Sequence, residues 1–232
     1  CDASELAEKV RSMAFESAAT ARKVADAATR KVWVAGSLGP TGKSLTLASD
    51  ADDPSYRQYG FDDFVECYKA EAQALLEGGA DLFIFETAFD AANVKAGVRA
   101  LELLNNPLPV IISATVSDLS GRTLTGQTLE AFYRSIEHTP NLLAFGINCA
   151  LGAEKMALLA REISGFSHHA LSYYPNAGIP DENGNYNDSP ELMADIARGL
   201  AADGILNIAG GCCGTTPEHI RALADALRPL SP

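Results

Sequence analysis

Long apolar runs and an excess of positive charge are both missing from this sequence of 232 residues. A membrane-spanning helix needs about 20 consecutive apolar residues, and no segment of the chain reaches that length. Nucleic-acid binding needs clustered Lys and Arg, whereas 18 basic residues stand against 30 acidic ones and the formal net charge is −12. We therefore expect neither a membrane nor a nucleic acid as a partner.

Cysteine is too sparse for a disulfide scaffold. The chain has five cysteines, an odd number, and its first residues contain no basic region followed by the apolar stretch of a signal peptide. These features indicate a reducing compartment, and we expect a cytoplasmic protein. Aromatic residues are also scarce, at 7% of a chain that is 47% hydrophobic. Alanine is abundant, which favours closely packed helices.

Six short apolar runs divide the chain. Most are continuously hydrophobic rather than alternating, which is typical of strands buried on both faces of a parallel sheet. They cover residues 32–39, 81–87, 108–116, 142–149, 169–175 and 205–212. Helical patterns cover residues 2–29, 61–77, 91–104, 128–137, 153–163, 190–202 and 217–227. The alternation predicts an α/β fold, and because no linker interrupts it we expect a single domain over residues 1–232.

The first helical pattern has an apolar face but no strand before it. The residues on this face recur at helical spacing, which indicates an amphipathic helix. They are Leu6, Val10, Met13, Ala21 and Val24. The chain starts with Cys1 rather than Met. A globular chain could start with such a helix, and a chain whose beginning had been removed would look the same.

Two architectures fit this alternation, an open doubly wound sheet and a closed (β/α)₈ barrel. No G-x-G-x-x-G follows the first predicted strand, which argues against a dinucleotide-binding sheet. Polar residues stand at the C-terminal ends of several strands, and these ends converge in a barrel. They are Glu86, Cys149, Asn176, Cys212 and Cys213. We predict a TIM-type barrel; since a barrel needs eight strands and typically about 250 residues, we expect this chain to lack the first two strands and to be N-terminally incomplete.

Cys212 and Cys213 are adjacent in the glycine-flanked stretch "GGCCGTTPEH". Neighbouring side chains on a strand point to opposite faces, so both sulfurs can reach one ion only where the backbone leaves strand geometry, as glycines permit. A helix is predicted to start directly afterwards. Thr215 or Thr216 can cap it, Pro217 suits its first turn, and Thr215 with Glu218 matches a capping box. By itself the pair fits a metal site no better than the alternatives. These are a buried pair of small hydrophobic residues and a vicinal disulfide, which is strained and uncommon.

Cys149 ends another predicted strand, in "FGINCALG", at the same end of the barrel. Three thiolates suit zinc, and three protein ligands leave one coordination position open, as in catalytic sites. Because each thiolate binds deprotonated, such a centre carries a net charge of about −1 and generates hydroxide poorly. It suits an incoming thiol held as a nucleophilic thiolate, so the implied chemistry is alkyl transfer to sulfur. We interpret Cys1 and Cys67 as bystanders, and the four histidines lack metal-site spacing.

These cysteine motifs resemble those of the homocysteine methyltransferase family, whose members bind zinc through one cysteine and a later Cys-Cys pair. Other stretches resemble the homocysteine-binding domain of cobalamin-dependent methionine synthase, and the likeness covers essentially the whole chain. They are "VAGSLGPTGK", "EGGADLFIFETAFDAANVKA", "ISATVSDLSGRTLTGQT" and "YYPNAGIPDENGNY". The resemblance implies a (β/α)₈ barrel with zinc at its C-terminal face, and methyl transfer from methylcobalamin to homocysteine to give methionine.

The same resemblance assigns roles to individual residues. The zinc ligands of the family match Cys149, Cys212 and Cys213. Asn176 matches a side chain that can fill the fourth zinc position before the substrate arrives, although a turn-forming asparagine is the alternative. Glu86 matches the acidic residue that holds the substrate ammonium, with a capping or ion-paired carboxylate as the alternative, and Asn148 and Asp118 are weaker candidates at the same rim. No catalytic residue is predicted beyond the zinc site.

The resemblance also implies partners outside this chain. Methylcobalamin, and 5-methyltetrahydrofolate as the ultimate methyl source, would be bound by separate cobalamin-binding and folate-binding modules. The loops "PNAGIP" and "SGRTLTGQT" favour this branch over relatives that use S-methylmethionine or betaine, which remain an alternative. The family's first strand with its D-G-A-M-G loop has no match here, so a catalytically inert fragment with a structural zinc site is a further alternative.

Overall fold

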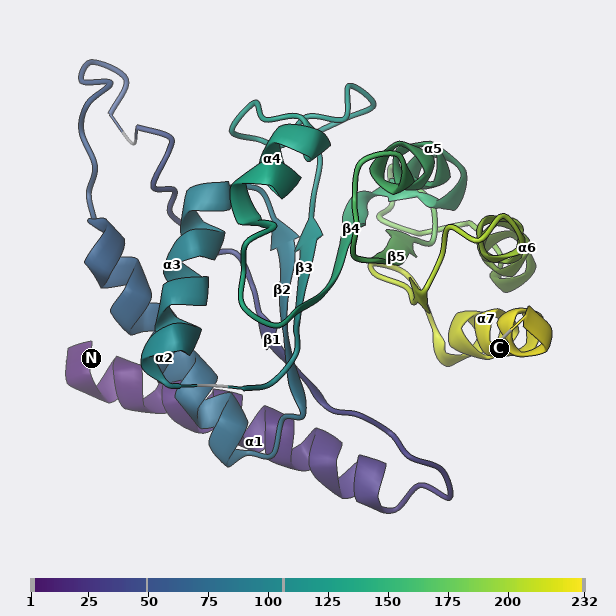
Figure 1. Ribbon diagram of the computed structural model, residues 1–232, viewed down its shortest axis with the longest axis horizontal. Helices are drawn as coiled ribbons and strands as arrows, with labels where there is room; N and C mark the ends of the chain where they lie inside the picture. Colours follow the sequence, from purple (N-terminus) through teal and green to yellow (C-terminus); the bar gives the residue numbers. More distant parts are fainter. Residues whose placement is uncertain (1–2, 49, 106, 231–232) are drawn as a thin grey trace. The chain divides into compact units, whose positions relative to one another are not determined.

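The computed structural model describes residues 3–48, 50–105 and 107–230, with side chains from Glu8 onward (Figure 1). The helices are α1 (Ala3–Asp26), α2 (Phe61–Glu77), α3 (Ala91–Leu103), α4 (Leu129–Ile136), α5 (Ala153–Ser164), α6 (Pro190–Ala202), α7 (Pro217–Leu227) and the 3₁₀ turn η1 (Arg228–Leu230). The strands are β1 (Ala35–Leu38), β2 (Leu82–Ala88), β3 (Val110–Ala114), β4 (Leu142–Gly152), β5 (Ala170–Asn176) and β6 (Ile208–Ala209). Every predicted strand and helix is present, which confirms the α/β class; Cys1 and Asp2 lie outside the described residues.

The strands follow chain order across the sheet, β1-β2-β3-β4-β5-β6. β1 pairs with β2 in parallel, with Ala35 opposite Leu82, and β4, β5 and β6 also pair in parallel. Parallel strands in chain order with a helix between them are the arrangement found in the wall of a β/α barrel. The closed eight-stranded barrel itself stays a prediction.

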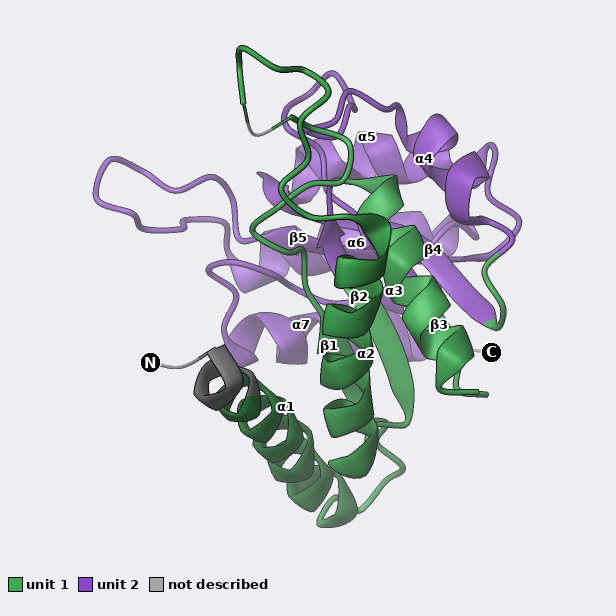
Figure 2. Ribbon diagram, turned by 90° about the vertical axis from the view of Figure 1, so that its left-hand side faces the viewer, with its two compact units in different colours: residues 1–85, 90–111, 139–141 green, residues 86–89, 112–138, 142–232 purple. Residues whose placement is uncertain are grey.

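The chain divides into two compact units (Figure 2). Unit 1 comprises Cys1–Phe85, Asp90–Ile111 and Thr139–Asn141, and unit 2 comprises Glu86–Phe89, Ile112–His138 and Leu142–Pro232. In unit 1 the ring of Phe85 meets Tyr68 of α2 edge-on, with centroids 5.9 Å apart. A Cβ atom at Gly97 would lie 2.2 Å from the Phe85 ring, so a glycine is needed where α3 crosses β2.

The contact between α1 and α2 in unit 1 does not use the apolar face expected from the sequence. Val10, Met13 and Val24 are 51%, 71% and 70% exposed. α1 instead buries Ala18, and a Cβ atom at Gly78 would lie 2.7 Å from the Cβ atom of Ala18. Small residues decide this contact because they let the helix backbones approach closely, which the hydrophobic pattern alone does not reveal.

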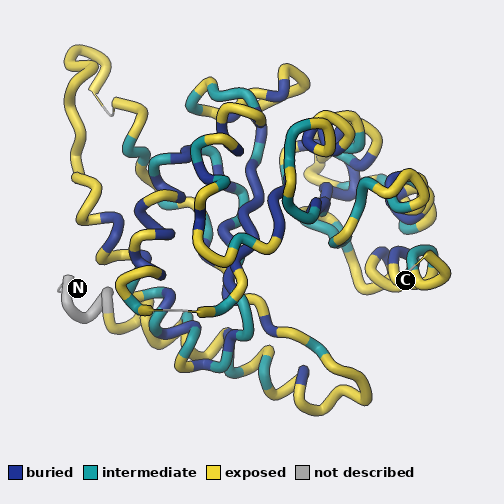
Figure 3. Tube along the Cα trace, in the orientation of Figure 1, coloured by how far each residue is buried: buried dark blue, intermediate teal, exposed yellow. Residues whose placement is uncertain are grey.

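Unit 2 has its own aromatic core between β4 and α4. Phe145 of β4 is fully buried and lies against Phe132 and Tyr133 of α4, with ring centroids 6.3 and 5.1 Å away. Figure 3 shows that burial follows the strands and one side of each helix. In the described part of the chain, no helix combines the length and apolarity needed to cross a membrane.

Candidate metal and substrate site

The turn that carries Cys212 and Cys213 is anchored to the end of β5 by main-chain hydrogen bonds. Cys212 N donates to Pro175 O (2.8 Å), and Ala177 N donates to Cys213 O (2.9 Å). β6 ends at Ala209, earlier than predicted, so the chain leaves strand geometry before it reaches the cysteines. Gly214 then has φ +77°, which L-residues rarely adopt. Both sulfurs can therefore turn toward the same side.

Cys149 reaches the same place through a distortion of β4. The register between β4 and β5 shifts between Asn148 and Gly152, and Cys149 and Ala150 both have φ +63°. Consecutive left-handed non-glycine residues cost energy and persist only where the surrounding structure enforces them. Thr87, one residue after Glu86 in β2, is also left-handed (φ 54°). Three of the five described non-glycine residues with positive φ are thus at or next to predicted site residues; the other two are asparagines, Asn105 and Asn141, which adopt this conformation more readily.

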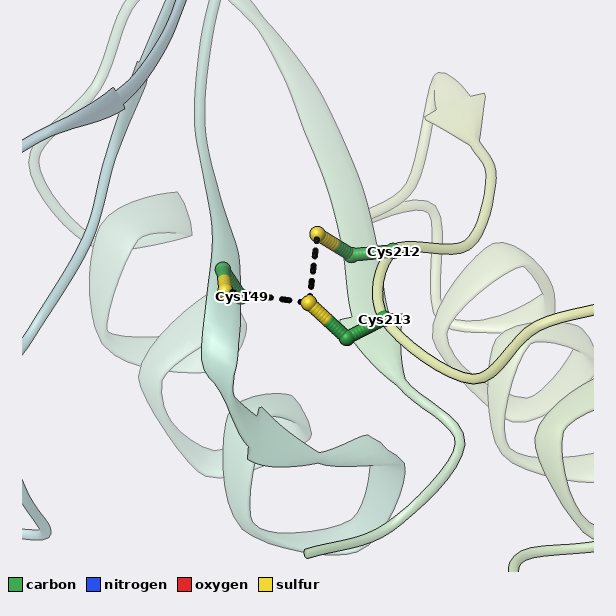
Figure 4. A group of neighbouring side chains, drawn as sticks. All are labelled: Cys149, Cys212 and Cys213. Atoms are coloured by element: carbon green, nitrogen blue, oxygen red, sulfur yellow. Dashed lines mark hydrogen bonds between the residues drawn. The ribbon is translucent and has the colours of Figure 1, made fainter. Parts of the chain in front are cut away.

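The three cysteines form a compact sulfur cluster (Figure 4). The Sγ atom of Cys213 lies 3.8 Å from that of Cys149 and 3.9 Å from that of Cys212, and all three lie within 4.8 Å of one another. Zn–S bonds of about 2.3 Å in tetrahedral geometry place ligand sulfurs about 3.8 Å apart. The two distances from Cys213 therefore already match those between zinc-bound sulfurs.

The chemistry of the cluster also suits a cation. Burial, and then the adjacent sulfurs of Cys149 and Cys213, raise the pKa of Cys212 to about 12. Without a cation, Cys212 holds its proton at neutral pH, whereas a bound divalent metal deprotonates a coordinating thiol. Cys212 and Cys149 are partly buried and Cys213 is exposed, so one side of the cluster is open.

Asn148 joins the strand ends around the cluster. Its Oδ1 atom accepts hydrogen bonds from Thr87 N (2.9 Å) and Ser113 Oγ (2.8 Å). Its Nδ2 group donates to Thr87 Oγ1 (2.9 Å) and contacts Cys212 Sγ at 3.9 Å. Asn148 is completely buried, and its donors and acceptors are engaged. It holds the strained residue after Glu86 and one sulfur of the cluster in a single network.

The other predicted residues occupy different surroundings. Asn176 is 4% exposed, and its Oδ1 atom accepts from Cys213 N at 3.1 Å, so it shapes the cysteine turn directly. Glu86 is half-buried at the end of β2, in the same unit as the cysteines. Asp118 lies in an exposed turn, where hydrogen bonds from Ser120 to its carboxylate lower its pKa.

The helix after the cysteines begins at Pro217 as predicted, and Thr216 is the one of the two candidate threonines that caps it. The main-chain N–H of Thr216 donates to His219 Nδ1 (3.1 Å), so the Thr215–Glu218 capping box is wrong. Thr215 Oγ1 donates instead to Cys212 O at 2.7 Å, because the turn that positions the cysteines uses this hydroxyl. His219 is buried in this cap, away from the sulfur cluster.

Sequence reasoning missed Tyr186, which borders the cluster from the loop after β5. Desolvation, and then the proximity of Cys213 with a side-chain hydrogen bond to it, raise the pKa of Tyr186. Tyr186 packs against Ala153 and Met193. A Cβ atom built at Gly214 would lie 2.3 Å from the Cβ atom of Tyr186. No spacing in the sequence indicates this contact, because a loop rather than a periodic element brings Tyr186 there.

Comparison with known proteins identifies the family of this chain. The sequence model of the family described as Homocysteine S-methyltransferase matches residues 2–227. The chain belongs to this family. As a member of the homocysteine S-methyltransferase family, the protein is a methyltransferase. The resemblance inferred from its cysteine motifs is confirmed at the level of the family.

Solved structures of one relative are similar to this family member over most of its length. The homocysteine methyltransferase MmuM from Escherichia coli, in its apo form, has a TM-score of 0.74 and 25% identity, covering 95% of this chain and 74% of that one. A metallated form of MmuM has a TM-score of 0.73 and 25% identity, covering 93% and 70%. MmuM thus takes up metal on a similar fold.

Proposed function

We propose that this methyltransferase transfers a methyl group to the thiol of homocysteine, giving methionine, at a zinc ion held by Cys149, Cys212 and Cys213. The observation that carries the proposal is the spacing of the sulfurs, 3.8 and 3.9 Å, which matches tetrahedral zinc–thiolate geometry. Membership of the family and the metallated form of the E. coli relative support it.

Different residues would bind the zinc ion and the two ends of the substrate. When bound, zinc would supply the positive charge that keeps a thiol deprotonated at neutral pH. Three protein ligands leave one position for the substrate sulfur. In the transfer, the S–CH₃ bond forms as the bond between the methyl group and its donor breaks, and the thiol proton passes to solvent. Glu86 would hold the substrate ammonium, because a carboxylate accepts hydrogen bonds and carries the opposite charge.

The amide residues would act mainly by positioning. Asn148 orients Cys212 and the strained Thr87, and Asn176 holds Cys213 through the main-chain N–H. Asn176 would also offer its side chain to the fourth zinc position in the resting state. We retain Asp118 as a rim residue that contacts the substrate from its exposed turn.

The methyl donor we propose is methylcobalamin carried by a separate cobalamin-binding module, recharged from 5-methyltetrahydrofolate on a folate-binding module. The loops "PNAGIP" and "SGRTLTGQT" support this donor. We further propose that residues 1–232 belong to a single barrel domain acting in methionine biosynthesis. The free thiols of Cys149, Cys212 and Cys213 support a location in the reducing cytoplasm.

Metal analysis tests the zinc site. The reduced protein should contain about one zinc per chain, and Cys213→Ser should abolish tight binding because two thiolates no longer complete the site. Cys67→Ser is the matched control, since Cys67 is an exposed thiol on α2 and should leave the zinc content unchanged. Absence of zinc from the reduced wild-type protein would contradict the proposal.

A methyl-transfer assay tests the reaction and the donor together. Methionine formation from homocysteine should require zinc and should proceed with methylcobalamin, and Cys213→Ser should reduce it to background. Activity with S-methylmethionine or betaine alone would replace the proposed donor. Zinc binding without transfer from any donor would mark the site as structural.

A further inference from the structure

Two adjacent tyrosines on β5 have opposite hydrogen-bonding situations. Tyr173 Oη donates to Ala153 O at 2.7 Å, so the donor of this buried hydroxyl is satisfied. The next side chain points to the other face of the strand. There the Tyr174 hydroxyl is buried, and among the residues that the structure describes it has no hydrogen-bond partner.

Tyr174 lies beside the proposed substrate site. It stands opposite Asn148 in the register of β5 and β4, and Asn148 contacts Cys212 Sγ at 3.9 Å. A Cβ atom built at Gly210, two residues before Cys212, would lie 3.3 Å from the Tyr174 Cβ atom.

Burial raises the pKa of Tyr174, the nearby Ser113 hydroxyl partly offsets this, and the charge of Glu86, together with that of Cys212 when its thiol is ionised, raises it further. Ser113 donates its own proton to Asn148 Oδ1 and makes no ordinary hydrogen bond to Tyr174. A phenol is protonated at neutral pH whatever its surroundings, so the Tyr174 hydroxyl has a proton to donate.

A buried hydroxyl without a partner is costly to the folded protein. Phenylalanine at the same position would avoid this desolvation penalty at nearly equal volume. Packing therefore gives no reason for a tyrosine here. Unsatisfied groups of this kind are expected where a ligand completes the hydrogen bond.

We propose that Tyr174 is a substrate-binding residue whose hydroxyl donates a hydrogen bond to the α-carboxylate of the thiol amino acid. This inference rests on the proposed function. Glu86, which only accepts, suits the ammonium, and the ammonium and carboxylate of an amino acid are attached to the same carbon atom. A neutral donor near Glu86 therefore meets the carboxylate, while the substrate chain extends toward the sulfur cluster. Tyr174 makes the site selective for thiols that carry an amino-acid head group.

Calorimetric titration of the zinc-loaded protein with two ligands tests this role. L-homocysteine carries the carboxylate, whereas 3-aminopropane-1-thiol has the same amine and thiol without it. Tyr174→Phe should weaken homocysteine binding roughly 10- to 100-fold, because a hydrogen bond to a charged group is lost, and should leave the aminothiol unchanged. In the assay, KM for homocysteine should rise with little change in kcat.

Tyr173→Phe is the matched control, one residue away on the same strand. It should lower the thermal stability of the ligand-free protein and leave homocysteine affinity unchanged, whereas Tyr174→Phe should leave that stability equal or higher. Unchanged homocysteine binding by Tyr174→Phe, or equal weakening of both ligands, would overturn the inference while the proposed function stands. A zinc-loaded wild-type protein that binds no homocysteine would overturn both.

Discussion

At the scale of single residues, the site depends on backbone conformations that most amino acids avoid. Thr87, Cys149 and Ala150 are left-handed without being glycine, and Gly214 completes the turn after the cysteine pair. Asn148 and Asn176 hold these segments by hydrogen bonds to Thr87 and to Cys213 N. The sulfur spacing is therefore maintained by the surrounding hydrogen bonds rather than by the cysteines themselves.

Gly214→Ala should impair zinc binding without unfolding the protein. A methyl group there meets the Tyr186 Cβ at 2.3 Å and is strained at φ +77°, so the cysteine turn must shift. We expect zinc affinity to fall roughly 10- to 100-fold, as for other changes in residues that orient metal ligands. Competition with a chromogenic chelator measures this.

Gly199→Ala is the control for that substitution. Gly199 lies in α6, and nothing stands within 4 Å of an added Cβ atom. Alanine there should stabilise the helix by about 0.5–1 kcal/mol and leave zinc affinity unchanged. Equal zinc affinity in both variants would show that the turn tolerates a side chain.

At the scale of elements, α1 is tied to the sheet of unit 1 by one carboxylate. Asp81 accepts from Val34 N at 2.8 Å, just before β1, and pairs with Arg22 of α1 at 2.7 Å. The Val34 hydrogen bond first, and then Arg22, lower the pKa of Asp81 below its ordinary value of 3.8. Since α1 leaves Met13 and Val24 exposed, this polar tie supplements a small apolar contact.

The stabilisation by Asp81 should depend on pH. Because the folded-state pKa is lowered, the stabilisation is present above about pH 4 and is lost as pH falls through the folded-state value. Asp81→Asn should cost about 1 kcal/mol at pH 7 and clearly less at pH 3, measured by urea unfolding. Asp195→Asn, which removes an exposed pair with Arg198, should cost little at either pH. A cost for Asp81→Asn that is equal at both pH values would contradict this role.

At the scale of the whole molecule, the predicted site belongs to one of the two compact units. Every predicted site residue, from Glu86 to Cys213, lies in unit 2. A ligand that binds only the folded state stabilises the part of the chain that forms its site. Metal binding should therefore stabilise unit 2 against local unfolding more than unit 1.

Hydrogen exchange measured by mass spectrometry should reveal this difference. Zinc at 100 times its Kd contributes about 2.7 kcal/mol, so the slowest amides of unit 2 should exchange roughly 100-fold more slowly. The amides around Cys149, Ala177 and Cys213 should respond most, and those of α2 in unit 1 least. Cys213→Ser should remove the response, and equal slowing in both units would contradict the assignment.

The sequence by itself determined the elements and the chemical type of the site. Continuous apolar runs and helical spacing are local properties, so all six strands and the helices between them were predicted, most of them close to their observed bounds. β6 is the exception, because it covers only Ile208–Ala209 of the predicted residues 205–212. The motifs around Cys149 and the Cys212–Cys213 pair were enough to identify the family, which the comparisons confirmed. The single domain, the barrel closure and the roles of the site residues stay predictions.

Only the tertiary structure decided which groups meet. The face of α1 that packs, the engagement of Asn148, the contact of Tyr186 with Cys213 and the unpartnered hydroxyl of Tyr174 were not foreseen. Each depends on contacts between segments far apart in the chain, where hydrogen bonds and close packing override local preference. Periodicity specifies what each segment becomes, whereas the contacts between segments decide which atoms a substrate can reach.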